Sequence, residues 1–226
     1  MIKKENFYKD ILGINYFYCD HRVKYEIIDK SILHSSLNLQ NSSKLEQMQK
    51  VIEEVSSCYK CILGKTRSNV VPGEGNLDAE IMFIGEGPGE DEDKQGRPFV
   101  GRAGQLLTKM IEAMGYKRED VYIANIVKCR PPNNRAPFDD EAFACIGYIK
   151  KQIEIVNPKV IITLGSTATK YLLNTDKKIS TIRGEFQDYN GIKVMPTFHP
   201  SYLLRNQSMK KPAWEDLKKV MAFLKK

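Results

Sequence analysis

The stretch that decides the fold is AEIMFIGEGPGEDED, residues 79–93, in which an apolar run leads into a glycine-rich loop. A short apolar run bounded by glycine predicts a buried strand over residues 79–84. The next apolar residues recur at intervals of three and four, which predicts a helix that ends at Gly115. A strand followed by a helix is the unit from which parallel sheets are built. The apolar residues of this predicted helix are Ala103, Leu106, Leu107, Met110, Ile111 and Met114.

The same alternation occurs three more times toward the C-terminus. Apolar runs over residues 121–127, 160–164 and 192–198 predict strands, and a stretch of helical spacing follows each of them. We therefore predict an α/β fold, a three-layer α-β-α sandwich around a central four-stranded parallel sheet. With 226 residues, 42% of them hydrophobic, the chain can bury a core of this size.

A further helix is predicted upstream of the first strand. Ser43 and Glu46 have the spacing of a capping box, which is typical of a helix N-terminus. The apolar side of this helix would comprise Leu45, Met48, Ile52, Val55 and Cys58. Residues 1–40 are rich in aromatic side chains but have no clear period. We predict that residues 1–40 form an N-terminal extension of unknown role and that residues 41–226 form the functional domain.

Charge and cysteine content suggest the setting in which the protein acts. The chain has 35 Lys and Arg against 28 Asp and Glu, and the net charge of +7 favours a polyanionic partner such as nucleic acid. Five cysteines are too few for the disulfide scaffold of a small secreted domain, so we expect a reducing, cytoplasmic location. We expect no signal peptide and no membrane span, since the sequence contains no apolar run of about eighteen residues.

Four of the cysteines suggest a metal centre. Cys58 and Cys61 form a C-x2-C pair that could chelate one metal, and Cys129 and Cys145 could complete a shell of four thiolates. Zinc and a 4Fe-4S cluster both accept this set. Zinc ribbons usually have two close pairs, so the wider spacing of the second pair favours iron–sulfur. The alternative for Cys145, which lies on an apolar helix face, is a small core residue.

The glycine loop lacks the features of common nucleotide sites. Residues 85–93 have glutamate where a dinucleotide fingerprint has its third glycine. Residues 96–103 have the glycine spacing of a phosphate loop without its lysine or its hydroxyl. Nicotinamide binding and nucleotide hydrolysis are therefore not favoured. The acidic residues of the loop could bind a divalent ion for a nuclease, or they could form a solvated turn.

Two polar residues are predicted to meet the glycine loop at one edge of the sheet. Asn125 lies near the carboxyl end of the second predicted strand, and His199 follows the fourth. Open α/β sheets bind their ligands at this edge. A buried amide without a partner costs about 1–3 kcal/mol, so Asn125 must meet either the protein or a ligand.

The segment after His199 combines apolar and basic residues. Tyr202, Leu203 and Leu204 place apolar side chains on a predicted loop, and Arg205 follows them. Apolar wedges flanked by basic residues enter the DNA base stack in minor-groove binders. The alternative is that these side chains pack beneath the loop.

Taken together, these segments resemble the family 4 uracil-DNA glycosylases, the iron–sulfur branch of the uracil-DNA glycosylase superfamily. The resemblance runs from about Cys58 to the C-terminus, includes all four cysteines and leaves residues 1–40 outside. The matching segments are residues 85–93 (GEGPGEDED), 96–105 (GRPFVGRAGQ), 125–132 (NIVKCRPP) and 199–206 (HPSYLLRN).

The resemblance implies a monofunctional enzyme that flips uracil out of single- or double-stranded DNA, with a structural 4Fe-4S cluster on the four cysteines. It implies that the backbone of Glu86 and Gly87 lines the uracil pocket and that Phe99 stacks on the base. Asn125 would pair with the Watson–Crick edge of uracil. The residue at the position of Glu92 would block the methyl group of thymine.

For the chemistry, the resemblance implies that His199 stabilises the departing uracil anion near O2. Residues 202–204 would fill the gap left by the flipped base. Many relatives outside family 4 have a water-positioning aspartate at the site of Gly87, so this role is unassigned here, with Glu86 as a candidate. We expect a monomer.

Two rival functions stay open at this point. One is a metal-dependent nuclease built on the acidic loop, and the other is a DNA-binding module of glycosylase fold without catalysis. The presence of Asn125 and His199 argues against the binding module. A covalent uracil-binding branch of the superfamily is disfavoured because its histidine-bearing insertion after the glycine loop is absent.

Overall fold

The computed structural model describes residues 14–19, 22–27 and 43–225, which divide between Gln47 and Met48 into two compact units. In the first unit, β1 (Ile14–Cys19) and β2 (Arg22–Ile27) form an antiparallel hairpin. The aromatic segment in which it lies has no clear period, so this hairpin was not predicted. The predicted N-terminal extension of unknown role, residues 1–40, lies mostly outside the described residues.

The second unit contains a six-stranded sheet in the order β3-β5-β4-β6-β8-β7. Four strands, β5, β4, β6 and β8, pair in parallel, which confirms the predicted parallel core. The predicted total of four is too low because β3 and β7 add antiparallel edges that are too short to show a period. The strands are β3 (Glu74–Gly75), β4 (Ile81–Gly85), β5 (Tyr122–Asn125), β6 (Val160–Leu164), β7 (Gln187–Tyr189) and β8 (Ile192–Thr197).

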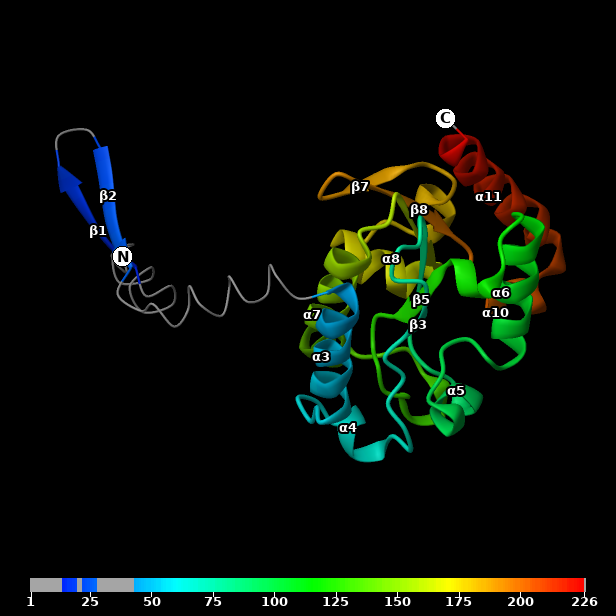
Figure 1. The fold of residues 1–226 in the computed structure, drawn as a ribbon. Helices are drawn as coiled ribbons and strands as arrows, with labels where there is room; N and C mark the ends of the chain where they lie inside the picture. Colours follow the sequence, from blue (N-terminus) through cyan, green and yellow to red (C-terminus); the bar gives the residue numbers. More distant parts are fainter. Residues whose placement is uncertain (1–13, 20–21, 28–42, 226) are drawn as a thin grey trace. The chain divides into compact units, whose positions relative to one another are not determined.

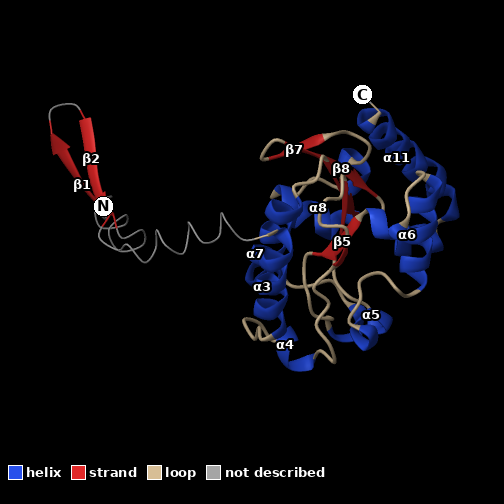
Figure 2. Ribbon diagram, in the orientation of Figure 1, coloured by secondary structure: helices blue, strands red, loops and turns tan. Residues whose placement is uncertain are grey.

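Helices cover both faces of this sheet (Figure 1; Figure 2). Met82 and Ile84 of β4 pack with α3, α7 and α8, whereas Ile81 and Phe83 pack with α6 and α11. This alternation confirms the three-layer sandwich. The helices are α3 (Lys44–Ser56), α4 (Leu63–Thr66), α5 (Glu90–Gln95), α6 (Arg102–Ala113), α7 (Asp139–Val156), α8 (Gly165–Leu173), α9 (Ile179–Ile182), α10 (Pro200–Arg205) and α11 (Lys210–Leu224). No helix among the described residues is long and apolar enough to cross a membrane.

Helix α3 begins at the predicted capping box. The backbone N–H of Ser43 donates to Glu46 Oε2 at 2.9 Å, and the N–H of Glu46 donates to Ser43 Oγ at 3.3 Å. Met48 and Val55 are buried as predicted. The prediction is wrong for Leu45, which is 70% exposed, because the helix meets the core only from Met48 onward.

The carboxyl ends of the four parallel strands bring the predicted site residues to one edge. Gly85 ends β4 and lies directly beside Asn125, the last residue of β5. Leu164 ends β6 beside Thr197 of β8, and His199 follows two residues later. The glycine loop, Asn125 and His199 therefore meet at the same edge, as the strand order predicts.

Gly104 of α6 allows a close approach that any side chain would prevent. A Cβ at this position would lie 1.9 Å from the carbonyl oxygen of Phe99, whose backbone has a φ of 51°. We expect Gly104→Ala to lower the free energy of unfolding by about 1–3 kcal/mol in urea titrations, since the backbone of Phe99 must move.

Gly147 provides the matched control for this substitution. It lies exposed within α7, and a Cβ added there would meet nothing within 4 Å, so Gly147→Ala should stabilise the protein by about 0.5–1 kcal/mol. Equal effects of the two substitutions would contradict the assigned contact.

Candidate active site

A cavity of about 790 Å³ lies at the carboxyl edge of the sheet. Its volume is in the range of sites for small molecules. Most of the site residues predicted from the sequence line it. These are Glu86, Gly87, Glu92, Phe99, Asn125, His199, Tyr202 and Arg205. Leu203 and Leu204 are not among the lining residues.

Asn125 lines this cavity and has an unsatisfied acceptor. Its side chain is 1% exposed, and among the described residues its Oδ1 is the one buried side-chain nitrogen or oxygen that has no hydrogen-bond partner. A Cβ at Gly85 would lie 2.4 Å from this oxygen, so glycine is needed beside it. A buried acceptor without a partner costs about 1–3 kcal/mol, which a ligand N–H could offset.

Phe99 forms a second wall of the cavity. Its ring is buried, and the ring centroid lies 5.7 Å from that of His199 with the planes tilted by 34°. The ring approaches Gly85 so closely that a Cβ there would lie 2.4 Å from Phe99 Cζ. An aromatic face beside a buried amide suits a planar heterocycle.

Glu92 ties the glycine loop to the segment that follows Phe99. Its carboxylate accepts hydrogen bonds from the backbone N–H groups of Gly89 at 3.0 Å, Val100 at 2.8 Å and Gly101 at 2.9 Å. Glu92 is only 9% exposed, and these three hydrogen bonds explain why its carboxylate can be buried. The specificity role implied by the resemblance stays a prediction.

Two other acidic residues of the loop, Asp93 and Glu90, also have protein partners. Asp93 accepts from the backbone N–H groups of Ser68 and Asn69, and Glu90 pairs with Lys94 and Arg130. These carboxylates hold the loop in place. The nuclease alternative requires carboxylates that are free to bind metal, and of the five acidic residues in the loop only Glu86 and Asp91 have no such partner among the described residues.

His199 is held as a neutral hydrogen-bond donor. Its Nδ1 accepts from the backbone N–H of Ser201 at 3.1 Å and lies 2.7 Å from Ser201 Oγ. Burial, and to a lesser degree the charge of Arg205, lowers the pKa of His199 to about 4. At neutral pH the ring is therefore uncharged, with its proton on Nε2.

Residues 200–205 form helix α10 rather than the predicted loop. Leu203 is 1% exposed and packs with Phe198 and Ala213, so the packing alternative holds for this side chain and it is not available as a wedge. Tyr202 is 36% exposed and its ring lies 5.0 Å from that of Phe198. Insertion of Tyr202 and Leu204 into the DNA base stack stays a prediction, and Arg205 beside them is exposed.

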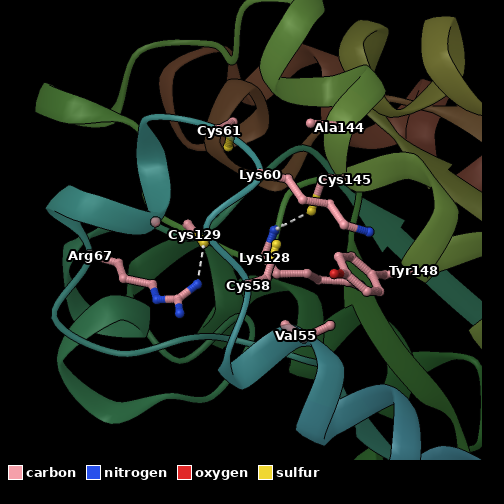
Figure 3. A pocket seen from close by; sticks show the side chains of 11 residues that line it. Val55, Cys58, Lys60, Cys61, Arg67, Lys128, Cys129, Ala144, Cys145 and Tyr148 are labelled. Carbon is pink, nitrogen blue, oxygen red and sulfur yellow. Dashed lines mark hydrogen bonds between the residues drawn. The ribbon is translucent and has the colours of Figure 1, made fainter.

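The four cysteines line one pocket on the α3 and α7 side of the sheet (Figure 3). Cys58 and Cys61 follow α3, Cys129 follows β5 and Cys145 lies on α7. All four are free thiols, with no disulfide among them.

Positively charged and N–H groups surround these sulfur atoms. Arg67 Nη1 donates to Cys129 Sγ at 3.1 Å, and the backbone N–H of Lys128 donates to Cys145 Sγ at 3.3 Å. Burial raises the pKa of the Cys145 thiol to about 11, and the charge of Lys128 opposes this shift. Burial in turn lowers the pKa of Lys128 to about 8. Burial therefore favours the neutral thiol at Cys145, whereas the charge of Lys128 and the N–H donor favour the thiolate.

Sequence reasoning missed Arg67, Lys128 and Ser201. Lys128 had a usable signal in the sequence, because it lies directly between the apolar run of residues 121–127 and Cys129. Arg67 and Ser201 had none, since their roles depend on contacts that only the folded chain brings about.

Comparisons with known proteins show the family to which the chain belongs. The family described as the uracil DNA glycosylase superfamily matches residues 72–218. Type-4 uracil-DNA glycosylases from three organisms are similar over most of their length. The enzyme from Thermotoga maritima is 54% identical over an alignment that covers 80% of this chain and 96% of the length of that enzyme. Those from Saccharolobus solfataricus and Sulfurisphaera tokodaii are 50% and 49% identical, each over 78% of this chain and over 86% and 84% of their own.

The chain therefore belongs to the uracil DNA glycosylase superfamily. Within it, the chain groups with the type-4 enzymes, which confirms the resemblance found in the sequence.

The protonation state of His199 gives a direct prediction. In nitrogen-15 NMR spectra, His199 should show the neutral Nε2–H tautomer from pH 8 down to about 5, since its pKa is about 4. Between pH 6.5 and 4 the unfolded chain takes up this proton first, so the contribution of His199 to stability falls as the pH is lowered. A cationic ring at pH 6 would contradict the assignment.

Proposed function

We propose that this protein removes uracil from DNA by flipping the base into the cavity and hydrolysing its N-glycosidic bond, which leaves an abasic site. Membership of the superfamily supports this proposal. The observation that carries it is that Asn125, which lines the cavity, has a buried Oδ1 without a hydrogen-bond partner among the described residues. This acceptor matches a donor that uracil has and cytosine lacks.

Base recognition follows from the donors and acceptors of the amide. Uracil offers N3–H to Oδ1 and accepts at O4 from the amide NH₂. Cytosine presents an acceptor at N3 and a donor at N4, so both groups would be mismatched. Phe99 supplies the stacking surface, the backbone of Glu86 and Gly87 lines the pocket, and Glu92 excludes the thymine methyl group.

Bond cleavage requires stabilisation of the uracil anion as it leaves. His199 would donate its Nε2–H to O2, and one well-placed donor of this kind contributes about 3–4 kcal/mol to the transition state. Ser201 keeps the proton on Nε2 by occupying Nδ1. Glu86, which lines the cavity and is partly exposed, is the candidate for positioning the attacking water.

Binding of the DNA strand would fall to the surface around the cavity mouth. The net charge of +7 favours a polyanion. Arg205 and Tyr202 of α10 line the cavity and are exposed. Arg205 could therefore bind a phosphate, and Tyr202 could fill the gap that the flipped base leaves in the stack. The strand can be single or double, since the base is read only after it has left the stack.

The four-cysteine pocket fits a 4Fe-4S cluster better than a zinc ion. A single Zn²⁺ holds its sulfurs about 3.8 Å apart, given Zn–S bonds of about 2.3 Å. Among the described residues, no group of three or more potential ligands is placed to hold a single metal ion, although the four cysteines line one pocket. Cys58, Cys61, Cys129 and Cys145 would hold the cluster, which would supply structural cross-links between the segments after α3 and β5 and helix α7.

The test uses purified protein, EDTA and an oligonucleotide that carries one uracil. A strand break at the uracil that appears only after hot alkali would support glycosylase activity without a dissociable metal. Breakage before alkali would indicate a nuclease. DNA that stays intact but shifts in a gel would indicate a binding module, and either result would overturn the proposal.

Substitutions at the two pocket residues should abolish most of the activity. We expect His199→Ala and Asn125→Ala to reduce single-turnover excision by about a hundredfold or more, because each removes a group that contacts the leaving base. Lys151→Ala, a surface change on α7, is the matched control and should leave the rate unchanged. Near-normal rates in both pocket variants would refute these roles.

The metal content gives a further prediction. Protein purified without oxygen should be brown and hold about four iron and four sulfide ions per chain. Cys145→Ser should lower the iron content and the melting temperature together, since the cluster links separate segments. A colourless protein that contains zinc would contradict the cluster.

A further inference from the structure

Residues 125–129 form a short strap from the cavity to the cysteine pocket. Asn125 lies at one end of this strap and Cys129 at the other. The backbone between them is fixed at each position. The N–H of Ile126 donates to the carbonyl of Gly85 at 2.9 Å, and that of Val127 donates to the carbonyl of Glu86 at 3.1 Å. Two carbonyls of the glycine loop are thereby held by the strap.

Lys128, inside the strap, is a buried cation with neutral hydrogen-bond partners. Its side chain is 1% exposed, and its Nζ donates to the main-chain carbonyl of Asn125 at 2.9 Å and to Gln152 Oε1 at 2.6 Å. Within the part of the chain that the structure describes, no carboxylate pairs with it. A buried charge without a partner of opposite charge destabilises the fold, so a lysine at this position indicates a function beyond packing.

Gln152 holds its acceptor in place for this lysine. Its Nε2 donates to the carbonyl of Pro72 at 2.8 Å and to Tyr122 Oη at 3.2 Å. With its NH₂ group committed in this way, the amide can only present its oxygen to Lys128. The ammonium therefore has a fixed position beneath Asn125.

The backbone of the same lysine contacts the other site. Its N–H donates to Cys145 Sγ at 3.3 Å, and the next residue in the chain is Cys129 (Figure 3). Thiolate ligands would supply the negative charge that the neutral partners of the ammonium do not. One residue thus touches the main chain of the base-reading asparagine and a sulfur of the cysteine pocket.

We propose that Lys128 is a positioning residue that couples the four-cysteine centre to base recognition by holding the carbonyl of Asn125 in place. This inference rests on the proposed function for the identity of the base. Loss of the ammonium should weaken both sites, although its hydrogen bonds go to the Asn125 carbonyl and to Gln152.

The test compares Lys128→Met with the wild-type holoprotein. Methionine has a similar length but neither charge nor donor. Free uracil should bind about tenfold or more weakly by calorimetric titration, because the Asn125 amide loses its fixed orientation. Visible absorbance should decay about tenfold faster in the presence of an iron chelator, as is typical when a residue that supports a metal ligand is lost. Lys151→Met, an exposed lysine of α7, should change neither quantity.

A purely structural role would not give this pattern. DNA with a tetrahydrofuran residue, which has no base, should bind Lys128→Met as tightly as wild type, since the DNA surface is untouched. If Lys128→Met does not fold, Lys128→Gln, which keeps a donor, enters the same comparison and should show a partial loss at both sites. An unchanged uracil affinity, an unchanged rate of iron loss, or weaker tetrahydrofuran binding would each overturn the proposal.

The proposed function and this proposal can fail separately. A wild-type protein that binds free uracil but excises none from DNA refutes the glycosylase function, and the proposal is still decided by the variant's uracil affinity and iron loss. A wild-type protein that excises uracil while Lys128→Met retains both properties refutes the proposal alone.

Discussion

The parallel register that places Gly85 of β4 beside Asn125 of β5 is the constraint on which the site depends. With no side chain at Gly85, the Asn125 amide and the Phe99 ring can approach the same point. Phe99 in turn keeps its unusual backbone because Gly104 leaves room for it and Glu92 binds the two N–H groups that follow it. The cavity wall is thus fixed by backbone contacts rather than by side-chain packing alone.

An ion pair between Asp216 and Arg183 supports the end of β8. Asp216 of α11 accepts a hydrogen bond from Thr197 Oγ1 at 2.6 Å and pairs with Arg183, whose guanidinium lies over the Phe198 ring. These contacts hold the two residues that precede His199. A buried carboxylate is tolerated when each partner is in place, and removal of one partner leaves an expensive charge. The histidine is therefore positioned from α11 as well as from its own helix.

Much of this arrangement could be predicted from the sequence. The parallel sheet follows from apolar runs that alternate with helical spacing, and the meeting of Asn125 with His199 follows from strand direction. The edge strands β3 and β7 were not predictable because two or three residues show no period. Leu203 was misplaced because a six-residue helix after His199 turns it into the core. The ammonium of Lys128 beneath Asn125 depends on Gln152, which is distant in sequence.

The most direct test of the central claim is a crystal structure of the protein with free uracil bound. We predict that N3 of uracil lies about 3 Å from Asn125 Oδ1, with O2 facing His199 Nε2 and the ring stacked on Phe99. The acceptor that lacks a partner in the protein alone would then be satisfied. Uracil bound elsewhere, or in the cavity with Asn125 Oδ1 still unpaired, would contradict the assignment of this asparagine as the group that reads the base.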